Sequence, residues 1–185
     1  MPRLFVAIDI PEQIKEALTR FTRELPVARW VPADQAHLTL RFLGDVGEQT
    51  FAAIKSALSG LSFPGFSLYL HGTGHFPPGK RPRVLWVGVE ANDTLTALYR
   101  DLERALLAAG IPPEERPFSP HLTLARLKET IPAAVQTFEA RHGALAYPPF
   151  EVREVILFSS VLTNQGAIHS KEMTVRCQGS PAAEV

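Results

Sequence analysis

The chain has 185 residues, of which 45% are apolar and 21% are charged, with 19 basic and 19 acidic side chains. This composition is typical of a globular protein, and the balanced charge excludes a molecule that attracts polyanions over its whole surface. The single cysteine, Cys177, excludes an internal disulfide and a zinc site built from several cysteines, and we expect it to be an inert, partly buried side chain. If nucleic acid binds, it is expected to bind locally, through a short end.

The apolar runs and the N-terminal stretch do not have the patterns of a membrane span or a signal peptide. The runs LFVAI (4–8) and VLWVGV (84–89) are far too short to span a bilayer, and an acidic residue at Asp9 does not fit a signal peptide. We therefore expect a monomer in the cytoplasm that does not bind a membrane. Residues 1–177 are expected to form a single domain, and residues 178–185, which lack an apolar pattern, a disordered tail.

The first half of the chain is predicted to run strand, helix, strand, helix, strand. Residues 4–25 begin with a strand pattern and continue as a helix, for whose first turn Pro11 is suited. A strand begins at His37 with HLTLRF, residues 48–61 carry apolar side chains at helical spacing, and another strand begins at Phe66. The first half is thus predicted to be a complete α+β unit.

The second half repeats this order of elements. The HLTL motif and the later strand each recur 84 positions on, and the first strand and helix recur 81 positions on. The counterparts are 85–106 with Asn92 and Asp93 as helix caps, HLTL at 121–124, a helix over 131–143 and a strand from Phe150. Chance similarity of two supersecondary units is the alternative, and the shared spacing argues against it. We therefore predict an α+β fold: a duplicated, pseudo-two-fold, bilobal unit whose antiparallel sheets form a central cleft with helices on the outside.

Four of the histidines lie outside the HLTL motifs. The stretch 71–83 is rich in Gly and Pro, so it is expected to be an exposed loop between strands. His71 and His75 lie four positions apart in that stretch rather than on a helix, which does not indicate a metal pair. His142 and His169 carry no motif and are expected at the surface. No metal or cofactor is expected.

The motif places its polar side chains together. Alternate side chains of a strand point to opposite faces, so His37, Thr39 and Arg41 share one face and the leucines share the other. In the second copy His121 and Thr123 again point together. Two homologous strands in a pseudo-symmetric molecule are therefore expected to bring two His-Thr pairs to face each other across one cavity.

Two imidazoles at one cavity indicate acid-base chemistry. Imidazole titrates near neutrality, so one ring can donate a proton while the other accepts one. In-line displacement at phosphorus most needs this arrangement, because the attacking and leaving oxygens lie on opposite sides of the phosphorus. Threonine hydroxyls on the same faces are suited to hydrogen-bond the non-bridging oxygens.

With these motifs the chain resembles the 2H phosphoesterases, a family defined by two H-x-T-x motifs. It is most similar to the bacterial and archaeal RNA 2′,3′-cyclic phosphodiesterases, first described as 2′-5′ RNA ligases. The resemblance rests on both motifs, on their separation and on their flanks. The similar segments are RWVPADQAHLTLRFLGDV (29–46), GTGHFPPGKRPRVLWVGV (72–89) and FSPHLTLARL (118–127).

The resemblance implies metal-free hydrolysis of a terminal ribose 2′,3′-cyclic phosphate to a 2′-phosphate. It implies that His37 is the proton donor to the departing 3′-oxygen and that His121 is the proton acceptor that activates water. Thr39 and Thr123 would hold phosphate oxygens, and Arg126 would neutralise the charge that develops on the phosphoryl group.

Arg126 and two further residues, Arg41 and Phe76, are candidates for substrate contacts. Strict alternation would place Arg126 on the face of Leu122, so the strand must bend or end near Ala125. Arg41 lies on the polar face by alternation, either as a phosphate contact or as a solvated side chain. Phe76 is a candidate for stacking on a base.

Several functions remain open on sequence alone. One alternative is an enzyme of the same superfamily that acts on a small cyclic-phosphate nucleotide or a 2′-5′ linked oligonucleotide. Another is a non-catalytic module that binds RNA ends, and joining of RNA ends through a 2′-5′ bond is a related activity. Metal-dependent hydrolysis lacks support, since no histidine and carboxylate cluster at ligand spacing occurs.

Overall fold

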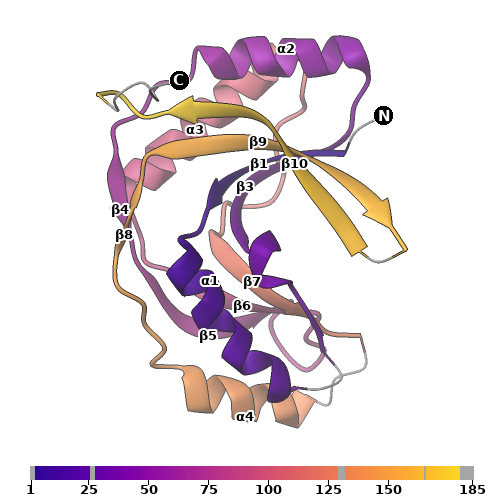
Figure 1. The fold of residues 1–185 in the computed structure, drawn as a ribbon, viewed down its shortest axis with the longest axis vertical. Coiled ribbons are helices and arrows are strands. Elements are labelled where there is room, and N and C mark those ends of the chain that lie inside the picture. The colour runs from indigo at the N-terminus through magenta and orange to yellow at the C-terminus, as the bar shows by residue number, and fades with distance from the viewer. Residues whose placement is uncertain (1–2, 26–27, 129–131, 165, 180–185) are drawn as a thin grey trace.

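The computed structural model describes residues 3–25, 28–128, 132–164 and 166–179, which form two lobes around one long, curved sheet (Figure 1). The elements follow in chain order: β1 (Arg3–Asp9), α1 (Glu12–Leu18), the 3-10 helix η1 (Thr19–Arg23), β2 (Arg29–Trp30), the 3-10 helix η2 (Ala33–Gln35), β3 (His37–Asp45), α2 (Glu48–Ser59), β4 (Phe66–Leu68), β5 (Leu70–Phe76), β6 (Val84–Val89), α3 (Asp93–Ala108), β7 (His121–Arg126), α4 (Pro132–His142), β8 (Phe150–Val152), β9 (Glu154–Thr163) and β10 (Gly166–Arg176).

The predicted duplication is present in the order of these elements. The run β1, α1, β3, α2, β4 and β5 corresponds to β6, α3, β7, α4, β8 and β9, while β10 has no counterpart. Asn92 is the N-cap of α3, where its side chain accepts a hydrogen bond of 2.9 Å from the backbone N–H of Leu95. Pro11 lies one position earlier than predicted, as the N-cap of α1. The predicted helix position Ile131 lies outside the described residues.

The two halves exchange their last strands. The main sheet has the order β10-β9-β1-β3-β7-β6-β5 and all its pairs are antiparallel, so β9 of the second half joins β1 and β5 of the first half joins β6. At the centre, β3 meets β7 through Leu38 and Leu122, and a separate pair of strands, β4 and β8, joins Ser67 to Glu151. The partners in both pairs are 84 positions apart in the chain, so the pseudo-two-fold axis passes between them. The predicted α+β fold is confirmed.

The helices are exchanged between the lobes in the same way. Figure 1 shows α2 and α3 together at one end of the molecule and α1 and α4 at the other. The α1 end is joined to α4 through Phe21, which is fully buried and packs edge-on against Phe138 at 5.6 Å between ring centroids. Burial of large apolar side chains of this kind is the main stabilising term for such a layer. Within the described residues, no helix is both long enough and apolar enough to cross a bilayer.

The stretch 71–83 is not a loop throughout, which corrects the prediction from its Gly and Pro content. Residues up to Phe76 belong to β5, which pairs with β6 along its length, and only 77–83 connect the two strands. Gly74 is required in the strand because the Trp86 indole lies on it, and a Cβ there would be 2.3 Å from that ring. Gly72 has a φ of 67° at an irregularity in the register. Glycine in a strand thus marks a close approach and a bulge here.

The tail was predicted to begin at residue 178, but Gln178 is still hydrogen-bonded to the rest of the fold. Gln178 donates its backbone N–H to the carbonyl oxygen of Phe63 at 2.9 Å, and its side chain reaches Ser62. Residues 180–185 lie outside the described residues. Cys177 is buried, as expected.

Candidate active site

The two HLTL motifs meet on one face of the sheet at the boundary between the lobes. Leu38 and Leu122 are paired across β3 and β7, and both are fully buried in the main core. Their neighbours in each strand therefore point to the opposite face. Because the strands are antiparallel, this register places His37 beside Thr123 on that face, and Thr39 beside His121. The sequence prediction that the two His-Thr pairs face each other holds for the strand register.

Each of the two histidines is held by a hydrogen bond from its Nδ1 to a backbone carbonyl oxygen two residues upstream. His37 Nδ1 lies 2.6 Å from the carbonyl oxygen of Gln35. At the equivalent position of the second half, His121 Nδ1 lies 2.7 Å from the carbonyl oxygen of Ser119. A carbonyl oxygen only accepts, so each Nδ1 carries the proton and each Nε2 is left as the functional nitrogen. The duplicated chain thus fixes both rings in one tautomer through the backbone just upstream of each motif.

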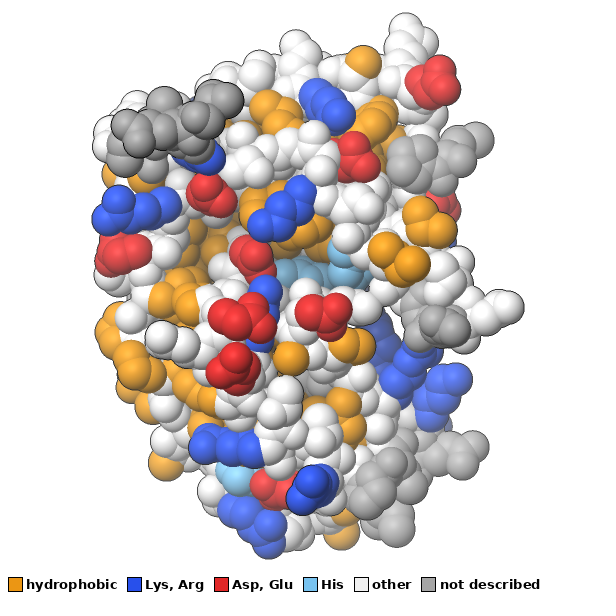
Figure 2. All heavy atoms as spheres, in the orientation of Figure 1, with side chains coloured by type: hydrophobic (Ala, Val, Ile, Leu, Met, Phe, Trp, Pro, Cys, Tyr) orange, Lys and Arg blue, Asp and Glu red, His pale blue; other side chains and the backbone are white. Residues whose placement is uncertain are grey.

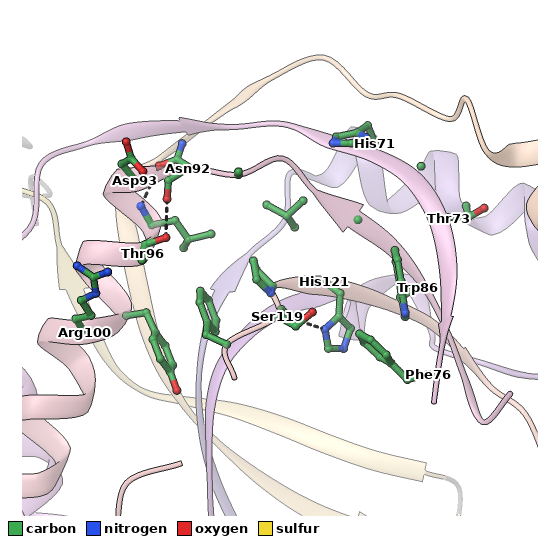
Figure 3. Close-up of a pocket in the computed structure, with 18 residues that line it drawn as sticks. His71, Thr73, Phe76, Trp86, Asn92, Asp93, Thr96, Arg100, Ser119 and His121 are labelled. Carbon is green, nitrogen blue, oxygen red and sulfur yellow. Dashed lines mark hydrogen bonds between the residues drawn. The ribbon is translucent and has the colours of Figure 1, made fainter. Parts of the chain in front are cut away.

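The surroundings of the two rings differ. His37 stacks on Phe5 at 4.7 Å between centroids, and the ring of His169 meets it edge-on at 5.6 Å. Burial among these rings is the main cause that lowers the pKa of His37, to about 4, and the hydrogen bond to Gln35 opposes it. His121 packs instead against the edge of Phe76 at 5.0 Å (Figure 3). At neutral pH, before substrate binds, His37 is therefore a neutral imidazole.

The site is divided into two neighbouring cavities. A cavity of about 610 Å³ is lined by His37, Thr39, Thr123 and Arg126. His121 lines a second cavity of about 780 Å³, together with Phe76, Trp86 and residues from the start of α3 (Figure 3). His121 and Thr123 lie two positions apart on one face of β7, so the two cavities adjoin at this strand, and the single gap between the two rings stays a prediction. Figure 2 shows histidine side chains grouped in the middle of one face of the molecule.

A β-bulge explains how Arg126 reaches the site. In the β6–β7 pair the register shifts between Leu85 and Trp86, so that Thr123 pairs with Trp86 but Ala125 pairs with Leu85. The extra residue on β7 reverses the alternation beyond Leu124, so Arg126 points to the same side as Thr123 and is exposed there. The sequence requires a bend near Ala125, and the structure supplies it as this bulge.

The same bulge in the first half removes Arg41 from the site. In the β1–β3 pair Ala7 faces Thr39 but Val6 faces Arg41, so Arg41 shares the side of the buried Val6. There Arg41 is only 10% exposed and pairs with Glu103 at 2.7 Å and Glu114 at 3.3 Å. Arg41 is therefore neither a phosphate contact nor a solvated side chain: it joins β3 to α3 and to the segment after α3.

Sequence reasoning missed three residues around His37. Gln35 holds the ring through its backbone and reaches β10 with its side chain, which donates to the carbonyl oxygen of Ala167 at 2.7 Å. His169, predicted to be a surface residue without a role, lines the cavity of His37, and its Nδ1 is buried without a partner in the described part of the chain. Arg29 also lines this cavity. The equal spacing from Gln35 to His37 and from Ser119 to His121 is the only signal in the sequence that pointed to any of them.

His142, the other histidine expected at the surface, is mostly enclosed. Its side chain is 16% exposed, lies 2.9 Å from the carboxylate of Glu24, and packs against Phe21 and Phe138. It serves the interface between η1 and α4. Among the described residues, no group of three or more His, Cys, Asp or Glu side chains is placed to hold a metal ion.

Comparisons with known proteins agree with this geometry. The model of the 2′-5′ RNA ligase superfamily matches residues 10–163. The chain belongs to that superfamily. An RNA 2′,3′-cyclic phosphodiesterase of Archaeoglobus fulgidus is 35% identical over 170 residues, which cover 90% of this chain and 96% of the relative. This confirms the resemblance drawn from the two H-x-T-x motifs.

Solved structures place the whole chain in the same superfamily fold. A crystal structure of a Thermus thermophilus protein matches with a TM-score of 0.80 and 29% identity, over 97% of this chain and 100% of that one. The crystal structure of E. coli LigT in complex with 3′-AMP matches with a TM-score of 0.76 and 27% identity, over 96% and 99%.

Proposed function

We propose that this chain is an RNA 2′,3′-cyclic phosphodiesterase that hydrolyses a terminal ribose 2′,3′-cyclic phosphate to a 2′-phosphate. The observation that carries the proposal is the pair of equivalent hydrogen bonds from Nδ1 of His37 and His121 to backbone carbonyls, which leave both Nε2 atoms for proton transfer on one face of the sheet. The phosphodiesterase relatives, such as the one from Thermotoga maritima at 35% identity over 95% of both chains, support it.

In the proposed step, water attacks phosphorus as the bond from phosphorus to the 3′-oxygen breaks. His121 Nε2 accepts the proton of the water, and His37 Nε2 donates a proton to the departing 3′-oxygen. The Thr39 and Thr123 hydroxyls donate hydrogen bonds to the non-bridging oxygens, and Arg126 stabilises the charge on them. Each residue of this set lies on the β3–β7 face.

The proton donor must be charged before it can act. Burial holds the pKa of His37 at about 4 before substrate binds, so the proton is taken up when the anionic phosphate arrives. An opposite charge beside an imidazole favours its protonated form, and the cavity of His37 is where that charge would lie. Substrate binding and activation of the acid are therefore coupled in this proposal.

The substrate is proposed to be an RNA end or a nucleotide that bears the cyclic phosphate. Phe76 lies against His121 and Trp86 in the cavity of His121, and we propose that it stacks on the base. No cofactor is part of the proposal. We further propose a monomer that acts in the cytoplasm as a single domain over residues 1–177, which the globular composition and the shared sheet support.

A second reaction is favoured by the size of the cavity beside His121. Its volume of about 780 Å³ is far larger than the roughly 30 Å³ of a water molecule. A 5′-hydroxyl of a second RNA end could take the place of the attacking water, which would form a 2′-5′ bond as the bond to the 3′-oxygen breaks. Joining of two such ends, measured against hydrolysis in the same mixture, tests this possibility.

The proposed function is tested by hydrolysis of a nucleoside 2′,3′-cyclic phosphate with EDTA present. We expect the wild type to give the 2′-phosphate, and His37→Ala and His121→Ala each to lose about 10²–10⁴-fold in kcat/KM. Arg104→Ala, which removes an arginine that is 78% exposed on α3, is the control for surface changes. Full activity in either histidine variant would remove that histidine from the mechanism, and a 3′-phosphate product would reverse the assignment of the leaving oxygen.

A further inference from the structure

Arg29 lies beside the proposed catalytic residues without an acidic partner. It belongs to β2, which pairs with β7 so that Arg29 is directly opposite Arg126. Directly opposite residues of an antiparallel pair share a face, and two like charges there destabilise the sheet. Both side chains are exposed, and neither has an ion pair or a side-chain hydrogen bond in the described part of the chain. An anion bound between or beside these two cations would offset their repulsion.

The register orders the polar side chains of the site into three rows. Along β7 the face carries His121, Thr123 and Arg126, and along the edge that it shares with β3 and β2 it carries Thr39, His37 and Arg29. The first two rows, His121 with Thr39 and Thr123 with His37, are related by the pseudo-two-fold axis, and the proposed function places one phosphate between them. The third row, Arg126 with Arg29, lies at one end of that phosphate site.

The pseudo-two-fold counterparts of Arg126 and Arg29 are not cations. The residue 84 positions before Arg126 is Phe42, which the equivalent bulge in β3 turns to the same face, where it is 55% exposed and lines the cavity of His37. The residue 84 positions after Arg29 is Pro113. Arg3 also lines the cavity of His37, but it pairs with Asp45 at 3.3 Å, so the arginines of this cavity that have no ion pair among the described residues lie at one end of the site. A polyanion bound at the centre is therefore directed toward Arg29.

We propose that Arg29 binds the phosphate on the 5′ side of the terminal nucleotide, so that the site selects an RNA end over an isolated cyclic nucleotide. The proposal rests on the proposed function, which places the 2′,3′-phosphate among the histidines and threonines. The RNA continues from that ribose only through its 5′-phosphate. This second phosphate would reach the third row, where Arg126 and Arg29 present their guanidinium groups. Arg126 remains with the reacting phosphate, and Arg29, one strand away, takes the next one. A planar guanidinium suits this role because it forms paired hydrogen bonds to phosphate oxygens.

The test uses two substrates that differ by one phosphate: adenosine 2′,3′-cyclic phosphate, and the same compound with a 5′-phosphate. We expect the wild type to favour the second compound by about ten-fold or more in kcat/KM, because a hydrogen bond to a charged group is worth at least that factor. The ratio of the two values cancels general damage to the site. It is expected to fall close to one in Arg29→Ala, to be partly restored in Arg29→Lys, and to keep the wild-type value in the surface control Arg104→Ala.

Binding measurements separate this inference from the proposed function. Calorimetry with adenosine 3′,5′-bisphosphate and with 3′-AMP gives the same comparison without turnover, and Arg29→Ala is expected to remove the preference for the bisphosphate. A wild-type ratio near one, or a ratio that Arg29→Ala leaves intact, would overturn the role of Arg29. If the wild type prefers the bisphosphate in binding but hydrolyses neither cyclic compound, the proposed function fails and the second phosphate site stands.

Discussion

The most direct physical consequence of the site is a cost in stability that His37 imposes in acid. Its pKa is lowered from 6.5 to about 4, chiefly by burial against Phe5 and its neighbours. Between these two pH values the unfolded chain binds a proton at this position and the folded chain does not. The free energy of unfolding therefore has its full value above pH 6.5, declines as the pH falls toward 4, and levels off below it.

The size of this effect follows from the shift. A difference of about 2.5 pKa units corresponds to about 3.5 kcal/mol, at about 1.4 kcal/mol for each unit. This is an upper limit, since His37 faces a cavity and water can partly solvate the charged ring. For a domain of this size it is still a large share of the total stability, which is commonly about 5–15 kcal/mol.

The assay compares the wild type with His37→Asn in urea unfolding at several pH values between 4 and 7.5. Asparagine keeps an N–H that can donate to the carbonyl oxygen of Gln35, but it does not titrate. The other titrating groups cancel in the difference between the two proteins. That difference should rise in favour of the wild type by about 2–3 kcal/mol from pH 4 to pH 7. A difference that does not change with pH, or a His37 resonance that titrates near 6.5 by NMR, would refute the reasoning.

Three further predictions concern the supports of the site. Arg41→Ala leaves the carboxylates of Glu103 and Glu114 without their shared cation and should lower the free energy of unfolding by about 3 kcal/mol, measured in urea against the exposed control Arg104→Ala. Gly74→Ala forces the Trp86 indole to move, so a loss of about 1–3 kcal/mol should be accompanied by a shift in tryptophan emission, and an unchanged spectrum would contradict the contact. Asn92→Ala removes the N-cap of α3 and should cost about 1 kcal/mol, whereas Asn92→Asp, which keeps an acceptor, should cost less.

The elements and the duplication were predictable because they depend on local periodicity. Apolar spacing marks a helix at 48–61, and the structure has α2 at Glu48–Ser59; alternation marks the HLTL strands, which are β3 and β7. The 84-residue offset shared by the HLTL motif and the later strand predicted the correct partners for the pseudo-two-fold axis. The exchange of β5 and β9 between the halves was not predictable, because strand order depends on long-range pairing that local patterns do not encode.

The face on which a side chain lies was predictable only up to the first bulge. Alternation placed His37 and Thr39 correctly and failed for Arg41, immediately after Leu40, where an extra residue enters the strand. The second copy of the bulge brings Arg126 into the site. A bulge is set by pairing with the neighbouring strand rather than by the residues of the strand itself, so one sequence does not reveal its position.

Duplication alone would give a symmetric site, whereas the proposed reaction needs an acid and a base with different properties. The shared features are the ones that the repeat encodes twice: an imidazole bonded through Nδ1 to a backbone carbonyl, and a threonine next on the same face of the strand. The differences come from outside the repeat. His169 of β10, a strand without a counterpart, closes over His37 and helps to exclude water from it, while His121 opens to the larger cavity. Removal of His169 should therefore raise the pKa of His37 toward 6.5, measurable by NMR in His169→Ala, while His169→Phe, which keeps the ring, should raise it less. If both variants leave that pKa near 4, burial by His169 is not the cause of the lowered pKa of His37.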